Sequence, residues 1–160
     1  MPSVIVPEQP ILFYEGPHYY LSNFSSFAIM QRRTLWMTVE HAYQASKFFP
    51  GHHASVVGEI ERAMSAHDAK QIAKVNKEFV RPDWQEVKLE VMEKLLRLKF
   101  AQHSYIRRKL LETGTAPLIE DSPKDAFWGR GPDGKGQNQL GKLWMKIREE
   151  EQVKLQQANG

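Results

Sequence analysis

The sequence predicts a single, mainly α-helical domain over residues 1–160, with a few short β-strands. The chain has 160 residues, of which 41% are hydrophobic and 26% charged, as is typical of one soluble globular domain. Most apolar residues recur at helical spacing in blocks with recognisable start and stop signals. Only short apolar runs are left for strands. The packed core is expected over about residues 11–150, between a loose N-terminal leader and a polar C-terminal tail.

Composition excludes several classes of protein. There is no cysteine, so disulfides, thiol catalysis and thiolate metal sites are ruled out. Six histidines are scattered without metal-ligand spacing, and we expect neither a metal nor a cofactor. No secretory signal and no apolar run near the roughly 20 residues of a membrane span is present, so we expect a cytoplasmic protein without a membrane partner. The net charge of +3 permits an anionic ligand such as a phosphate.

The N-terminal part of the chain predicts short extended elements. The apolar and aromatic run Ile11–Tyr14 is expected to form a strand, and Glu15-Gly16-Pro17 ends it. The segment YLSNFSSF, residues 20–27, is expected to be an irregular loop. Residues 28–37 predict a hairpin that turns at residues 31–33 and leads the chain to Thr38.

The helix predicted over Thr38–Phe49 is the centre of the functional prediction. Thr38 is a good N-cap residue, and Pro50-Gly51 cannot continue a helix. At helical spacing, one side carries four polar groups, namely Glu40, Tyr43, Gln44 and Lys47. The back of the helix carries small residues that suit close packing against a neighbour. Two interpretations stay open: a polar face exposed to solvent, or a buried helix whose polar stripe lines a cleft.

Five more helices and one short strand are expected downstream. The helices are predicted over about residues 52–64, 65–75, 82–102, 104–112 and 140–156, the last with a polar tail that frays. The third of them has apolar residues at i, i+4 spacing, as a core-facing helix should, at Val87, Val91, Met92, Leu95, Leu96 and Leu98. Leu118 and Ile119 are expected in the strand. Trp84 and Lys88 lie one helical turn apart, so they can face one site together, although Trp84 also suits an anchor at a helix start.

The loop DAFWGRGPDGKGQNQLG, residues 125–141, imitates two nucleotide-binding motifs without satisfying either. Its glycines spell G-x-G-x-x-G, but no βαβ unit is expected around them. They also spell the start of a P-loop, but Gly136 stands where that motif needs a Ser or Thr for magnesium. Pro132-Asp133-Gly134 is better interpreted as a tight turn. The loop is either flexible or ordered around Trp128.

Five blocks of the sequence together resemble a known family. They are FYEGPHYYLSNF, TVEHAYQASKF, the pair Trp84 and Lys88, LKFAQH, and DAFWGRGPDGKGQNQLG. In the same order and at similar spacing, such blocks occur in the YbiA/RibX-like N-glycosidases of the NADAR superfamily. The resemblance covers about residues 13–148. It implies a compact, mainly helical fold with a few short strands.

The resemblance also implies an activity. Family members hydrolyse the N-glycosidic bond of phosphoribosylamino-pyrimidines, which are early riboflavin-pathway intermediates, and release ribose 5-phosphate. Other members of the superfamily remove ADP-ribose from guanine bases, which would make modified nucleic acid a partner. The expected substrate is therefore a small phosphoribosyl or ADP-ribosyl molecule. A module that binds nucleotide-like ligands without catalysis stays an alternative.

Breaking a C–N glycosidic bond needs an anion near C1 of the sugar, a proton donor near the base and groups that hold both ends. The expected catalytic residues are Glu40 as stabiliser or base, Asp125 as second carboxylate, and Lys47 as a phosphate contact or as a nucleophile that forms a Schiff base. Trp128 is expected to stack on the base. The remaining expected substrate-binding residues are Asn23, Tyr43, Gln44, Trp84, Lys88, Gly129, Arg130, Lys135 and Asn138.

Overall fold

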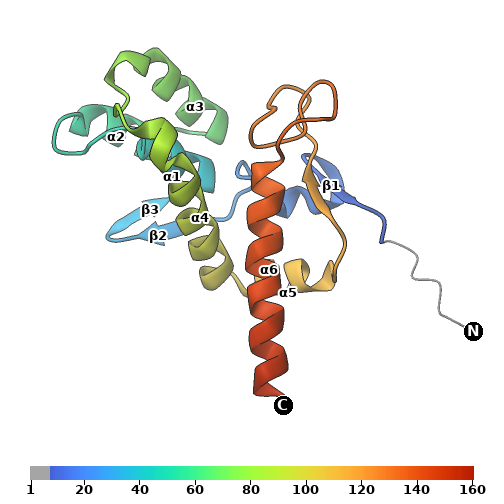
Figure 1. The fold of residues 1–160 in the computed structure, drawn as a ribbon. Coiled ribbons are helices and arrows are strands. Elements are labelled where there is room, and N and C mark those ends of the chain that lie inside the picture. The colour runs from blue at the N-terminus through green and yellow to red at the C-terminus, as the bar shows by residue number, and fades with distance from the viewer. Residues whose placement is uncertain (1–7) are drawn as a thin grey trace, which may run out of the picture. The chain divides into compact units, whose positions relative to one another are not determined.

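The computed structural model describes residues 8–160, so most of the predicted leader lies outside the described residues. The prediction of a mainly helical fold with a few short strands is confirmed. The chain forms two compact units (Figure 1). Residues 23–106 form the central unit, and residues 8–22 together with Arg107–Gly160 form the second unit, which is called the terminal unit here.

The central unit begins with the predicted hairpin. Strands β2 (Ile29–Gln31) and β3 (Thr34–Trp36) pair antiparallel, with Ile29 opposite Trp36. The turn falls at Arg32, whose φ of 57° lies in the left-handed region that a tight hairpin turn requires. Ile29 and Trp36 face the interior, whereas Met30 and Leu35 on the other face are exposed. This alternation is the one expected of a strand pair with one buried side.

Helix α1 (Val39–Ala45) starts as predicted and ends four residues early. The Thr38 side chain accepts a hydrogen bond from the His41 backbone N–H, as an N-cap should. After Ala45 the backbone changes to i→i−3 bonds, from Lys47 N–H to the Gln44 carbonyl (3.2 Å) and from Phe48 N–H to the Ala45 carbonyl (3.1 Å). The predicted stop at Phe49 is therefore wrong, because the last turn is tightened into the 3₁₀ form common at helix ends.

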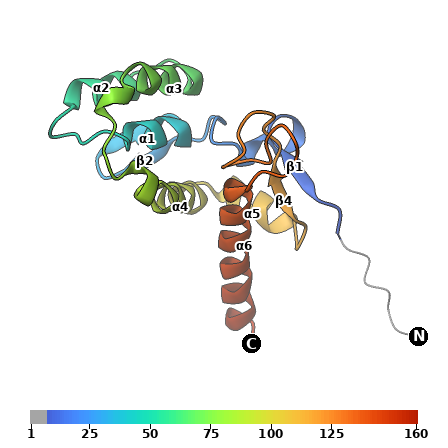
Figure 2. The same ribbon diagram turned by 45° about the horizontal axis from the view of Figure 1, so that its top comes forward.

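Three further helices complete the central unit. They are α2 (Ala54–Glu61), α3 (Ala66–Val75) and α4 (Trp84–Gln102), with the 3₁₀ turn η2 (Lys77–Phe79) between the last two. Ser65 caps α3 by accepting a bond from the Asp68 backbone N–H at 3.0 Å. Helices α1, α2 and α3 pack side by side (Figure 2), and α1 also packs against α4.

The buried face of α4 differs in part from the predicted one. Met92, Leu95 and Leu96 are fully buried, but Val87, Val91 and Leu98 are only half-buried. The next residue on the buried stripe is Lys99, at i+4 from Leu95, and its relative exposure is 0%. The core-facing stripe of α4 thus ends on a buried lysine.

The terminal unit contains a parallel strand pair that joins the two ends of the chain. Strand β1 (Ile11–Phe13) pairs in parallel with β4 (Leu118–Glu120), so both predicted strands are present. A 3₁₀ helix, η1 (Gly16–Leu21), follows β1 and includes the first two residues of the predicted loop, whereas residues 22–27 are irregular as predicted. Pro17 ends the strand, and its fixed φ also suits the first helical positions.

Two helices follow in the chain. Helix α5 (Ser104–Glu112) contains the boundary between the two units, and α6 (Gln139–Ala158) closes the terminal unit, continuing through the polar tail. The buried residues of α6 are confined to its first half, where Trp144 donates its indole N–H to the Leu21 carbonyl at 3.0 Å. Across residues 8–160, none of the helices combines the length and apolarity needed to cross a membrane.

Candidate functional site

The polar stripe of α1 is buried. The relative exposures of Glu40, Tyr43 and Gln44 are 6%, 7% and 2%, and every residue of α1 is buried. The interpretation of the stripe as a solvent-exposed face is therefore wrong. Polar groups are rarely placed at such depth unless hydrogen bonds or a ligand compensate for lost hydration.

Glu40 is held from two sides within the central unit. Its carboxylate Oε1 accepts a hydrogen bond of 2.7 Å from Gln44 Nε2, one turn along the helix. Its backbone N–H donates to the Asn23 carbonyl at 3.1 Å, which fixes the loop before the hairpin against the first turn of α1. Two residues predicted to bind substrate thus contact Glu40: Gln44 contacts its carboxylate and Asn23 its backbone.

Asn23 and Gln44 each carry a buried amide oxygen without a hydrogen-bond partner among residues 8–160. Asn23 Nδ2 points to the Met92 sulfur at 3.5 Å, which is a weak acceptor. The relative exposure of Asn23 is 8%. Unsatisfied buried acceptors are uncommon in folded proteins and are concentrated where a function requires them.

Lys47 lies over two aromatic rings. Its Nζ is 5.6 Å from the centre of the Tyr43 ring and 5.9 Å from that of Trp84, and the two rings are 5.1 Å apart. Burial lowers the pKa of Lys47, while nearby Glu40 raises it and Lys70 and Lys88 lower it further. The amine of Lys47 is thus easier to deprotonate than that of an exposed lysine.

Lys88 and Trp84 lie on the first turns of α4, as predicted. Trp84 is buried, and its contact with Tyr43 joins α4 to α1. The Lys88 ammonium donates to Gln85 Oε1 at 2.8 Å, and Lys88 is near enough to Lys47 to affect the pKa of that amine. The central unit therefore gathers seven of the predicted residues: Asn23, Glu40, Tyr43, Gln44, Lys47, Trp84 and Lys88.

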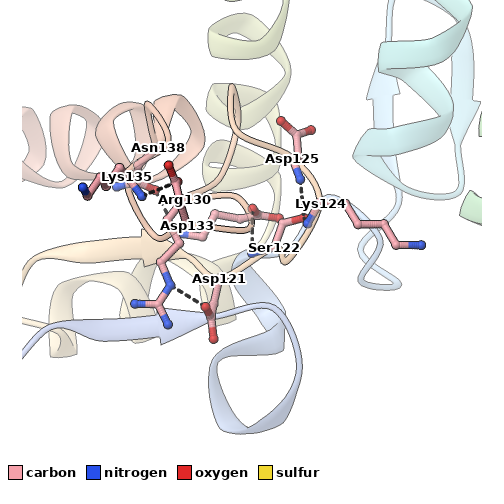
Figure 3. Close-up of polar contacts among 9 residues, drawn as sticks. Asp121, Ser122, Lys124, Asp125, Arg130, Asp133, Lys135 and Asn138 are labelled. Carbon is pink, nitrogen blue, oxygen red and sulfur yellow. Dashed lines mark hydrogen bonds and ion pairs between the residues drawn. The ribbon is translucent and has the colours of Figure 1, made fainter.

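The other six predicted residues lie on the loop between β4 and α6, in the terminal unit, and Figure 3 shows four of them: Asp125, Arg130, Lys135 and Asn138. Backbone hydrogen bonds pair the two arms of this loop: Gln137 N–H to the Ala126 carbonyl (2.8 Å) and Gln139 N–H to the Phe127 carbonyl (3.0 Å). The tip turns tightly from Gly131 to Gly134, closed by a bond of 3.3 Å from the Gly134 N–H to the Gly131 carbonyl. The predicted tight turn is confirmed, and the interpretation of a flexible loop is wrong.

Asp125 shapes the loop beside Trp128. Its Oδ1 accepts hydrogen bonds from the backbone N–H groups of Phe127 (2.9 Å) and Trp128 (2.8 Å), an arrangement in which a short side chain imitates a backbone turn. The half-buried indole of Trp128 meets the Phe127 ring edge-on, with 4.8 Å between ring centres. The contacts of Asp125 thus fix the backbone that presents Trp128.

Four further loop residues have distinct surroundings. Arg130 Nε donates to Asp121 Oδ1 at 2.6 Å, so its guanidinium is paired (Figure 3). Asn138 has both side-chain groups bound to β4, since Oδ1 accepts from Glu120 N–H and Nδ2 donates to the Leu118 carbonyl. Gly129 has no room for a Cβ, which would overlap the side chain and carbonyl of Glu120. Lys135 is exposed near the tip.

The sequence interpretation missed Lys99, which donates its Nζ hydrogen to Ser25 Oγ at 2.9 Å and lies 5.2 Å from the centre of the Phe27 ring. Burial lowers the pKa of Lys99 from 10.5 to about 7. Its position on the same helical stripe as Met92 and Leu95 is a sequence signal that predicts its burial. In residues 8–160, no group of three or more His, Asp or Glu side chains is placed to hold a metal ion.

Comparisons of sequence and of structure with known proteins point to the same family. The model of the NADAR domain matches residues 12–151. An N-glycosidase of Nostoc punctiforme is 40% identical over 142 residues (88% of this chain and 91% of that protein), and the N-glycosidase YbiA of Escherichia coli is 38% identical over 148 residues (91% of both). A riboflavin biosynthesis protein of Vibrio vulnificus is 41% identical over 150 residues, 91% of this chain.

This chain spans only 39% of the length of the Vibrio protein. The solved solution structure of E. coli YbiA superimposes with a TM-score of 0.83 at 36% sequence identity, covering 94% of this chain and 89% of that one. Sequence and fold therefore agree over almost the same residues, and the chain belongs to the NADAR domain family.

Proposed function

We propose that this protein is an N-glycosidase that hydrolyses the bond between ribose phosphate and base in phosphoribosylamino-pyrimidines of the riboflavin pathway, releasing ribose 5-phosphate. Relatives matched over about nine tenths of both chains are N-glycosidases, and the Vibrio relative is a riboflavin biosynthesis protein, which supports both the reaction and the pathway. The observation that carries the proposal is the buried α1 stripe, where Glu40 is held by Gln44 close to the shielded amine of Lys47.

In the first form of the mechanism, Glu40 works with water. As the C1–N bond breaks, positive charge grows on C1 and the base leaves with the electron pair and takes up a proton. The Glu40 carboxylate stabilises this charge, accepts a proton from the water that adds to C1, and then releases it to solvent, which supplies the proton that the base takes up. Gln44 Nε2 fixes the orientation of the carboxylate through its 2.7 Å hydrogen bond.

In the second form, Lys47 is the nucleophile. Its neutral amine adds to C1 of the ring-opened sugar, the C1–N bond to the base breaks, and the base leaves as an amine with a proton. The lysine imine that results is hydrolysed by water, which restores Lys47 and releases ribose 5-phosphate. Burial favours this form because it increases the neutral fraction of the amine.

The loop of the terminal unit carries separate proposed ligand contacts. The Trp128 ring is a stacking surface for a planar base, and such stacking contributes about 1–3 kcal/mol per base. Lys135, exposed near the loop tip, is the proposed phosphate contact. Asp125, Gly129, Arg130 and Asn138 are proposed to support the loop, since their contacts lie within it or with β4 and Asp121.

The test compares two substrates. The purified protein is incubated with a phosphoribosylamino-pyrimidine and, separately, with an ADP-ribosylated guanine, and the released sugar phosphate is identified by mass spectrometry. We expect ribose 5-phosphate from the first and slower or no release from the second. Release of ADP-ribose alone would instead assign the chain to the superfamily activity on modified guanine. Release from neither substrate would contradict the proposal.

A further inference from the structure

We propose that the amide oxygens Asn23 Oδ1 and Gln44 Oε1 form a pair of acceptors beside Glu40 that receives N–H or O–H donors of the bound ligand. This inference rests on the proposed N-glycosidase function and deepens it, because it fixes the chemistry of the ligand group held there. That group is rich in hydrogen-bond donors, as are the hydroxyls of ribose and the amino groups of an aminopyrimidine.

Both amide oxygens belong to buried side chains. Asn23 and Gln44 are 8% and 2% exposed, and within residues 8–160 no group hydrogen-bonds to either amide oxygen. A buried acceptor left unsatisfied destabilises the fold by the full loss of its hydration. Two such atoms, on residues that both hydrogen-bond to Glu40, Gln44 through the carboxylate and Asn23 through the backbone, indicate a place that a ligand completes.

The orientation of the Gln44 amide is fixed by Glu40. Gln44 Nε2 lies 2.7 Å from Glu40 Oε1, and a reversed amide would place two oxygen atoms at that separation. The carboxylate therefore determines which end of the amide is the oxygen, and Oε1 is the end left for a ligand. Asn23 is tied to the same residue, because its backbone carbonyl accepts the Glu40 N–H at 3.1 Å.

These placements decide which ligand groups fit. The two amide oxygens and the Glu40 carboxylate all accept hydrogen bonds, so a fully ionised phosphate, which also offers only acceptors, is unsuited to this place. A vicinal diol or an amino-substituted pyrimidine offers several donors and suits it. Selectivity for ligands that carry these donors is expected to be strong, because a ligand that lacks them leaves the buried acceptors unpaired.

The test measures binding rather than turnover. Isothermal titration calorimetry is carried out with ribose 5-phosphate, 2-deoxyribose 5-phosphate and 5,6-diaminouracil as probes. The main variant is Asn23→Leu, which removes one acceptor and keeps a similar volume. Gln44→Met is the second variant and also removes the donor to Glu40. Gln102→Met is the matched control, because the Gln102 amide is exposed and both of its ends bond to Met30.

We expect Asn23→Leu and Gln44→Met to weaken binding of ribose 5-phosphate or of diaminouracil by about tenfold, the worth of one hydrogen bond. The Tm of ligand-free Asn23→Leu should stay unchanged or rise, because an unsatisfied acceptor is removed. A purely structural asparagine would show the opposite, a lower Tm with unaltered binding. Gln102→Met should bind both probes like the parent.

The probes also separate the two sources of donors. If the variants bind ribose 5-phosphate more weakly, and 2-deoxyribose 5-phosphate binds weakly even to the parent, the donors are sugar hydroxyls. If the variants bind diaminouracil more weakly, the donors are amino groups of the base. A parent that binds neither probe, or variants that bind both as tightly as the parent, would overturn the acceptor pair. If the parent has glycosidase activity but the variants bind the probes as the parent does, only the acceptor pair is refuted. If the variants bind more weakly but the parent has no glycosidase activity, only the proposed function is refuted.

Discussion

Replacing Lys99 by methionine should remove a pH dependence from the stability of the protein. Lys99 is fully buried, and burial lowers the pKa of its amine from 10.5 to about 7. Methionine has a similar length and no charge, so it can occupy the same space without the free-energy cost of burying a charged amine. The Lys99→Met variant therefore separates the titration of the buried amine from its packing.

The sign and size follow from the two pKa values. Between pH 7 and pH 10.5 the unfolded chain binds the Lys99 proton and the folded chain does not, so the free energy of unfolding of the parent rises with pH. The shift of about 3.5 units (10.5 − 7), at about 1.36 kcal/mol per unit, gives a rise of about 5 kcal/mol. Below pH 7 both states are protonated and this contribution no longer changes.

The assay is urea unfolding of both proteins, followed by circular dichroism at pH 6, 7, 8, 9 and 10. The difference in unfolding free energy between variant and parent should be largest at and below pH 7, in favour of Lys99→Met, and shrink toward pH 10. Lys94→Met is the control, because Lys94 lies exposed on the same helix in an ion pair with Glu90. A parent-to-variant difference that stays constant with pH would refute the reasoning.

Three further predictions concern other residues. Lys47→Arg should keep substantial activity if Lys47 only supplies charge, and should lose activity if Lys47 forms an imine. In the imine case, borohydride added during turnover should leave a sugar adduct on the parent protein, detectable by mass spectrometry. Trp128→Ala should weaken ligand binding by calorimetry with little change in Tm, whereas a loss near 3–5 kcal/mol of stability would show a packing role. Gly129→Ala should destabilise the protein by about 1–3 kcal/mol in urea unfolding, because a Cβ there would overlap Glu120, while Gly51→Ala, where a Cβ meets nothing within 4 Å, should be near neutral.

Local signals predicted most of the fold. The Thr38 and Ser65 caps, the hairpin after Ala28 and the long helix that follows Pro82 all depend on residues adjacent in sequence, and each occurs in the structure. The parallel pairing of β1 with β4 could not be read from the sequence, because it joins segments about a hundred residues apart. The early end of α1 was also missed, since i→i−3 bonding after Ala45 has no clear signature in residue type.

The positions of side chains along a helix were predicted better than their surroundings. The spacing of Glu40 and Gln44 placed both on one helical face, and they do hydrogen-bond. Spacing alone could not decide between a solvent-exposed and a buried face, which depends on tertiary packing. Likewise, a lysine at a core position such as Lys99 is interpreted as surface by residue type, although its i+4 relation to Leu95 placed it on the buried stripe.

Glu40 is proposed to drive the cleavage of an N-glycosidic bond, and turnover of Glu40→Gln tests this role most directly. Release of ribose 5-phosphate from a phosphoribosylamino-pyrimidine is followed by mass spectrometry for parent and variant, with calorimetry of ribose 5-phosphate binding alongside. We predict that the variant keeps its fold and binds the probe, but hydrolyses the substrate at least about 10²-fold more slowly, as expected for loss of a general acid–base group. A Glu40→Gln variant that hydrolyses the substrate as fast as the parent would contradict the account.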